Sequence, residues 1–104
     1  MHKLQQNMYI GILSVNLSVP YRETIKERRN VLRSIKDTVK KKFNVSVSEI
    51  TESDEVTSSA KLAVVAVSGD PSYLQSILSN VFNLLENNHP DKIISYKTDI
   101  LSHD

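Results

Sequence analysis

Residues 62–85, LAVVAVSGDPSYLQSILSNVFNLL, contain a strand, a turn and a helix in sequence. The run 62–69 is short, rich in β-branched residues and apolar at almost every position, which is typical of a central strand buried on both faces. Asp70 can cap the helix that follows, and Pro71 suits its first position, where a missing N–H costs nothing. Residues 87–90 (NNHP) should end this helix. Its apolar residues recur with helical spacing, and they are Leu74, Ile77, Leu78, Val81, Leu84 and Leu85.

Three further segments alternate between apolar and polar residues, as strands do. Residues 8–19 are apolar on one face throughout and on both faces in their first half, which predicts a second largely apolar strand that Pro20 ends. Residues 43–50 and 92–101 are more polar, which is typical of edge strands. The polar, acidic stretch 51–60 is predicted to be a hairpin loop.

Residues 22–43 are predicted to form one long helix, since they contain neither glycine nor proline. Its apolar residues span an arc of about 120°, and they are Ile25, Val31, Leu32, Ile35, Val39 and Phe43. Arg28 falls in the middle of this arc. Its aliphatic part can run past the sheet edge so that its charge reaches water, or the guanidinium can pair with a buried acid such as Glu49 or Asp99.

The order of the elements is βαββαβ, with two apolar strands for the centre of a sheet and two polar ones for its edges. Right-handed crossovers then place both helices on one face of the sheet. We therefore predict an α+β fold, the ferredoxin-like split βαβ: a four-stranded antiparallel sheet with two helices on one face. One domain should span residues 8–102, and residues 1–7 are interpreted as a flexible N-terminal extension.

The composition narrows the classes of function. With 104 residues there is room for one core, and the absence of cysteine excludes disulfides, thiolate metal sites and thiol nucleophiles. No apolar run approaches the roughly 18 residues of a membrane span, which favours a cytoplasmic protein. The three histidines lack metal-binding spacing, and no nucleophile with a partnered base is visible. We therefore expect no metal, no cofactor and no enzymatic activity.

Positive charge is concentrated in the first predicted helix. Residues 22–42 hold nine of the thirteen Lys and Arg against three acids, a charge of +6, whereas the rest holds four against nine, a charge of −5. Six cations are spaced 4, 3, 4, 3 and 4 residues apart: Arg22, Lys26, Arg29, Arg33, Lys36 and Lys40. At about 100° per residue they form one stripe along the helix, beside the apolar arc. Such a stripe favours a polyanionic partner, although an inert solvated face is the ordinary alternative.

The segment 25–35, IKERRNVLRSI, resembles the hallmark S-L-K-E-K-R-x-V-x-K-S-L of the YlxP-like bacterial family, a domain of unknown function. Phe43 to Glu49 is similar to the F-N-V-S-V-A-E that follows it, and the resemblance extends over residues 8–101. It implies a ferredoxin-like fold. The family's genes commonly lie beside those for a translation initiation factor and a ribosome-binding factor, which implies ribosomal RNA as a partner. The resemblance implies no catalytic residue, and residues 51–55 (TESDE) depart from the family pattern.

The function predicted from these observations is that of a non-catalytic RNA-binding or ribosome-associated accessory protein. The six cations of the stripe would contact phosphates and position the protein without reading sequence. Base stacking on the sheet is disfavoured, because the strand 62–69 has no aromatic residue. The alternative is a self-associating regulatory or small-ligand-binding module that uses the open sheet face, and a homo-oligomer is compatible with either. RNA binding predicts a steep dependence on salt, whereas self-association predicts a dependence on protein concentration.

Overall fold

The computed structural model describes residues 7–19, 25–50 and 59–104, and its elements follow the predicted βαββαβ order. They are β1 (Met8–Ser18), α1 (Ile25–Lys42), β2 (Ser46–Glu49), β3 (Ser59–Ser68), α2 (Pro71–Asn88) and β4 (Ile93–His103). The predicted extension 1–7 lies outside the described residues except for its last residue.

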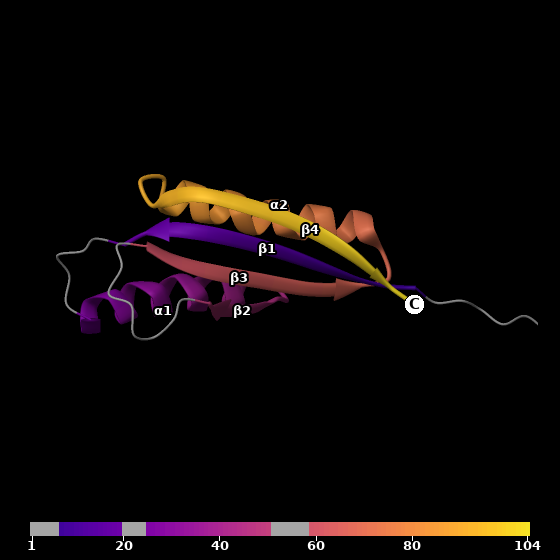
Figure 1. The fold of residues 1–104 in the computed structure, drawn as a ribbon, viewed down its shortest axis with the longest axis horizontal. Helices are drawn as coiled ribbons and strands as arrows, with labels where there is room; N and C mark the ends of the chain where they lie inside the picture. The colour runs from indigo at the N-terminus through magenta and orange to yellow at the C-terminus, as the bar shows by residue number, and fades with distance from the viewer. Residues whose placement is uncertain (1–6, 20–24, 51–58) are drawn as a thin grey trace, which may run out of the picture.

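The four strands form one antiparallel sheet in the order β2-β3-β1-β4. The two apolar strands lie in the centre and the two polar ones at the edges, as predicted. Both helices cover the same face of the sheet, with α1 over β2 and α2 over the other three strands (Figure 1). The ferredoxin-like architecture is thereby confirmed.

One continuous core lies between the sheet and the two helices. Alternate residues of β1 and β3 point into it, as do the apolar stripes of both helices, because a strand repeats every two residues and a helix every 3.6. Its largest fully buried side chains are Leu13, Leu17, Leu32, Leu62, Leu74, Leu78, Val15, Val19, Val39, Val64 and Val81.

The predicted caps of α2 are present. The Asp70 carboxylate accepts a hydrogen bond from the Ser72 N–H at 2.9 Å, and Pro71 begins the helix. At the other end the His89 N–H donates to the Leu85 carbonyl at 2.8 Å. These bonds satisfy backbone groups that a helix end leaves without partners.

The prediction that the strand at 62–69 is buried on both faces was wrong. In β3, buried residues alternate with half-buried and exposed ones, and Val67 is 58% exposed. The physical reason is that both helices pack on the same side, so no helix or strand in the described part of the chain covers the other face. The run of β-branched residues therefore predicted the central position of the strand correctly, but the burial of its second face incorrectly.

The boundaries differ from the predicted ones by a few residues. Helix α1 ends at Lys42 and β2 comprises four residues, because the chain turns between them with the Val45 N–H bonded to the Phe43 carbonyl at 3.0 Å. Strand β3 begins at Ser59, inside the predicted loop 51–60, of which residues 51–58 lie outside the described part. Strand β4 runs on to His103, since it pairs with β1 as far as Met8.

Candidate nucleic-acid interface

Five of the six predicted cations lie on α1 within the described residues, and we call this group the basic stripe: Lys26, Arg29, Arg33, Lys36 and Lys40. Arg22, the sixth, lies outside the described residues. Helical geometry confines the five to an arc of about 80°. Four are exposed and Lys36 is half-buried, because its position on the helix adjoins the apolar arc. The predicted stripe is therefore a continuous surface feature.

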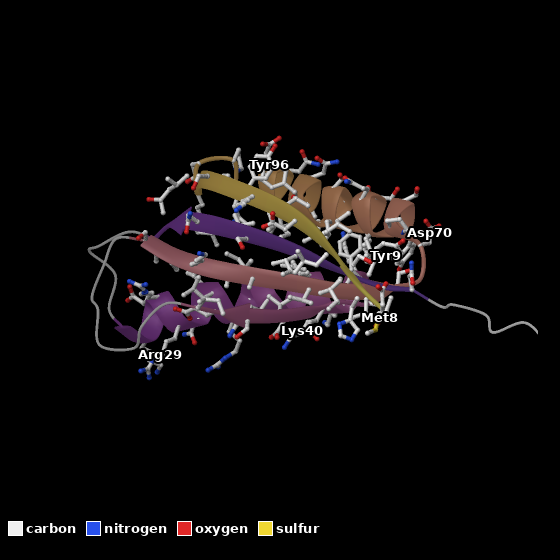
Figure 2. All side chains as sticks on the ribbon, turned by 45° about the vertical axis from the view of Figure 1, so that its right-hand side comes forward. Met8, Tyr9, Arg29, Lys40, Asp70 and Tyr96 are labelled. Carbon is white, nitrogen blue, oxygen red and sulfur yellow. The ribbon has the colours of Figure 1, made fainter. Side chains whose placement is uncertain are left out.

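The basic stripe faces solvent along one side of the molecule. Helix α1 buries Leu32, Ile35 and Val39 against the sheet, so its cations lie to one side of the core. Arg29 and Lys40 project from the side of α1 that is turned away from α2 (Figure 2). A partner can therefore approach the stripe without displacing any other element that the structure describes.

The cations of the basic stripe have no ion-pair partners within the described part of the chain. The ion pair found there joins the Lys97 ammonium to the Asp99 carboxylate at 3.7 Å, on β4. Asp37 follows Arg33 by four residues, a spacing at which opposite charges can pair on a helix. These two side chains nevertheless form no ion pair in the described structure. The charge of the stripe is thus available to an external anion.

The helix dipole explains only part of this charge pattern. Cations in the last turn of a helix stabilise its partial negative end, which accounts for Lys40 and its neighbours at 41 and 42. Lys26 and Arg29 lie near the start of the described helix, where the dipole is positive and disfavours cations. The helix dipole therefore does not account for the cations in the first half of the stripe.

Arg28 has a different environment from the stripe. It is half-buried, and its Nη2 donates a hydrogen bond of 2.8 Å to the Ser59 carbonyl at the start of β3. The guanidinium thus binds a backbone oxygen at the end of the sheet, a contact that neither sequence-based interpretation named. A main-chain acceptor has no signature in sequence, so the contact could not be predicted from residue types.

We expect Arg28→Met to lower the free energy of unfolding by about 1 kcal/mol, because a charge-assisted hydrogen bond to a partly buried carbonyl is lost. Urea unfolding monitored by circular dichroism would measure the change. Arg29→Met is the matched control, since Arg29 is exposed on the next position of the same helix, and it should change stability by less than about 0.5 kcal/mol. Equal effects of the two substitutions would contradict a structural role for Arg28.

A family profile described as "Protein of unknown function (DUF503)" matches residues 10–98. The chain belongs to the DUF503 family. The match spans nearly the whole described domain, from the start of β1 into β4, and includes the entire basic stripe. No curated protein matches the sequence.

Solved structures similar to the DUF503 chain share its fold. A dimeric protein of unknown function and ferredoxin-like fold from Bacteroides fragilis has a TM-score of 0.61 at 11% identity, covering 92% of this chain and 96% of its own. A candidate antibiotic biosynthesis monooxygenase from Nitrosomonas europaea has a TM-score of 0.53 at 10% identity, covering 98% and 95%. The de novo designed protein Foldit4 has a TM-score of 0.52 at 10% identity, covering 93% and 97%. At such identities the likeness concerns the fold alone.

Two further properties bear on the chemistry of this DUF503 protein. Among its described residues, no group of three or more His, Asp or Glu side chains is placed to hold a metal ion. None of the helices in that part of the chain has the length and apolarity needed to cross a membrane.

Proposed function

We propose that this protein binds structured RNA, on the ribosome, through the basic stripe of α1. Its cations would contact phosphate oxygens, which fixes the position of a protein on RNA without reading base sequence. Arg22, which precedes Arg29 by seven residues in sequence, is included in the proposal by its spacing. The protein is proposed to act as a non-catalytic accessory factor in the cytoplasm.

The observation that carries the proposal is the unpaired charge in the first half of the stripe. Lys26, Arg29 and Arg33 are exposed and have no ion-pair partner within the described residues. The first two lie near the N-terminal end of α1, where the helix dipole disfavours cations. Like charges three or four residues apart on a helix cost a few tenths of a kcal/mol per pair. A phosphate backbone would convert this unfavourable arrangement into a binding surface.

The resemblance to the YlxP-like family directs the proposal to ribosomal RNA in particular. The residues that carry that resemblance, 25–35, include three of the cations in the stripe. The resemblance implies genes that commonly lie beside those for translation factors, and such a neighbourhood would favour a ribosomal partner over other RNAs.

The charge-reversal variant Lys26→Glu/Arg29→Glu/Arg33→Glu tests the proposal. We expect the native protein to co-sediment with ribosomal subunits at low salt, with a slope of log K against log[salt] of about −3 to −5 if four to six phosphates are neutralised. The variant should lose co-sedimentation, because three phosphate contacts become repulsive. Sucrose-gradient fractionation followed by immunoblotting measures the distribution.

The matched control is Lys61→Glu/Lys92→Glu/Lys97→Glu, which changes the net charge by the same amount at residues outside α1. This variant should still co-sediment with the subunits. Unchanged binding by the stripe variant would refute the proposed site, and equal loss by both variants would show a non-specific effect of net charge.

A second candidate function, a self-associating regulatory module, rests on a different surface. The sheet face opposite the helices exposes apolar side chains, among them Val67 at 58% and Leu101 at 51%. The Bacteroides fragilis protein of the same fold is described as dimeric. Association through this face is compatible with RNA binding, because α1, which carries the basic stripe, packs on the opposite face of the sheet.

A further inference from the structure

The sheet face that the helices leave uncovered, which we call the open face, is organised in rows across β3, β1 and β4, and the edge strand β2 adds Ser46 beside Val65 and Ser48 beside Ala63. Residues paired in register lie side by side on the same face of a sheet. On β1 the open face carries the even-numbered residues, because the odd-numbered ones face the helices. The registers with β3 and β4 therefore define which side chains share each row.

Polarity changes steadily from row to row. The Ile10 row consists of Val67, Ile10 and Leu101, and the Ile12 row of Val65, Ile12 and Asp99. The Ser14 row contains Ala63, Ser14 and Lys97, and the Asn16 row contains Lys61, Asn16 and Ser95. Beyond the Ile10 row, Met8 lies at the end of the sheet (Figure 2). Met8 pairs there with His103 of β4. One half of the open face is thus apolar and the other half is polar and carries both lysines.

We propose that the apolar half of the open face binds a second copy of this chain. The two copies would be related by a two-fold axis that lies between the sheets, perpendicular to the strands, at the Ile10 row. This rotation places each residue of the Ile10 row over the same residue of the second copy. It places the Ile12 row of one copy over the end of the sheet, at Met8, in the other copy. The apolar halves then cover each other, and the lysine rows stay in water.

The charges of the open face fit this axis. Met8 of one copy would lie over Ile12 of the second copy, and His103 would lie over the second copy's Asp99, because these residues are two positions to either side of the axis on β1 and β4. Asp99, which pairs with Lys97 of its own chain at 3.7 Å, would then also contact a histidine of the second copy. Two such symmetric contacts would flank an apolar centre. An interface core depleted in charge with polar groups at its rim is typical of protein association.

A two-fold axis along the strands fits the same face less well. It would superpose equal rows, so that Asp99 would lie over Val65 and Lys97 over Ala63 of the second copy. Burying those charges against apolar side chains has a cost that the perpendicular axis avoids. The distribution of charge thus selects the perpendicular axis.

The size of the patch predicts a weak dimer. Three strands about 4.8 Å apart and three rows about 7 Å apart give on the order of 300 Å² of sheet per copy. This area lies in the range of transient associations. The dimer should therefore form and dissociate with protein concentration and should respond little to salt, since most of its contacts are apolar.

The proposed dimer does not depend on RNA binding. Packing through the open faces leaves both pairs of helices on the outside, so each basic stripe stays exposed. The mass of the protein in the absence of RNA tests the dimer, and ribosome co-sedimentation tests the stripe. Failure of one is thus distinguishable from failure of the other.

Sedimentation velocity over a wide concentration range tests association. The mass of the native chain should rise from 11.8 kDa towards twice that value. Val67→Lys should stay at the mass of one chain, because it places two ammonium groups against each other at the axis. Ser95→Lys, at the polar end of the same face, is the matched control and should associate like the native chain; both variants should keep the native circular dichroism spectrum. A native chain that stays monomeric, or a Val67→Lys variant that still dimerises, would overturn the proposal.

Disulfide cross-linking tests the axis, since the chain has no cysteine of its own. Ile10→Cys should form a cross-linked dimer under mild oxidation, because the two copies meet at this residue. Ser14→Cys lies four residues further along β1, about 14 Å away, and should not cross-link. Equal cross-linking of the two variants would contradict the perpendicular axis.

Exchanging the charges of His103 and Asp99 independently tests the proposed contact between these two residues across the axis. His103→Asp should weaken the dimer by placing a carboxylate over the second copy's Asp99. Combining it with Asp99→Lys should restore association. A double variant as weak as His103→Asp would show that the two residues do not meet across the axis.

Discussion

Leu13→Ala should lower the free energy of unfolding by about 3 kcal/mol. Leu13 lies in the middle of the central strand β1, between Val64 on β3 and Thr98 on β4, and none of its surface is exposed. Its replacement removes apolar contacts and leaves a cavity that a packed core fills only partly, which costs about 2–5 kcal/mol for a buried leucine. Urea unfolding, with the midpoint and slope fitted together, measures the change.

Ser14→Ala is the control for this prediction, because Ser14 is the next residue of the same strand and points to the open face. It should change the free energy of unfolding by less than about 0.5 kcal/mol. A loss below about 1 kcal/mol for Leu13→Ala would contradict tight packing between the sheet and the helices.

Gly11→Ala should lower the free energy of unfolding by about 2 kcal/mol, although alanine is ordinarily the better residue in a strand. A Cβ at this position would lie 2.9 Å from Leu78 Cδ1 and 3.3 Å from Leu74 Cβ, both on α2. Leu78 is only 1% exposed, so its methyl group is enclosed, and the Cβ of Leu74 is fixed to the helix backbone. The added methyl group must therefore push α2 away from the sheet.

Gly69→Ala provides the matched control, since it makes the same replacement at the chain's other glycine. The nearest atom to a Cβ there is the Asn7 carbonyl oxygen at 3.8 Å, an ordinary contact distance. The stability of this variant should be unchanged or slightly higher, because alanine restricts the unfolded chain. If Gly11→Ala were equally harmless, the close approach of α2 to β1 would not be required for stability. Thermal unfolding of both variants at one protein concentration would compare them directly.

Local features were predictable because each depends on residues that are neighbours along the chain. The cap formed by Asp70 and Pro71 lies within three residues of sequence, and the stop at His89 follows from the polar residues around it. The apolar stripe of α2 was predicted almost completely, with Leu84 half-buried and the other five residues buried. Periodicities of 2 and 3.6 are properties of the backbone, so residue spacing reveals them directly.

Features that depend on contacts between distant segments were not predictable in the same way. Leu62 to Gly69 has the composition of a strand covered on both sides, yet the helices leave one of its faces uncovered. The order of the elements predicted this placement of the helices, whereas the composition of the strand did not. Gly11 gave no signal of its own, since its role depends on how closely α2 approaches β1. Arg28 was identified as unusual from its phase on the helix, but its acceptor is a backbone carbonyl of a residue 31 positions away.

The two proposed surfaces differ in the same respect. Helical geometry alone places the basic stripe on one side of α1, so the amino-acid sequence determined which cations lie together. The tertiary structure added that Arg29 and Lys40 face away from α2 (Figure 2). The Ile10 row joins residues from three strands, and two of them, Ile10 and Leu101, are 91 positions apart in sequence. Only the register of the strands brings these residues together. Sequence by itself thus determined the elements, their caps and the charged face of one helix. Only the tertiary structure decided which side chains meet on the open face, because strand register is set by long-range packing that no local pattern encodes.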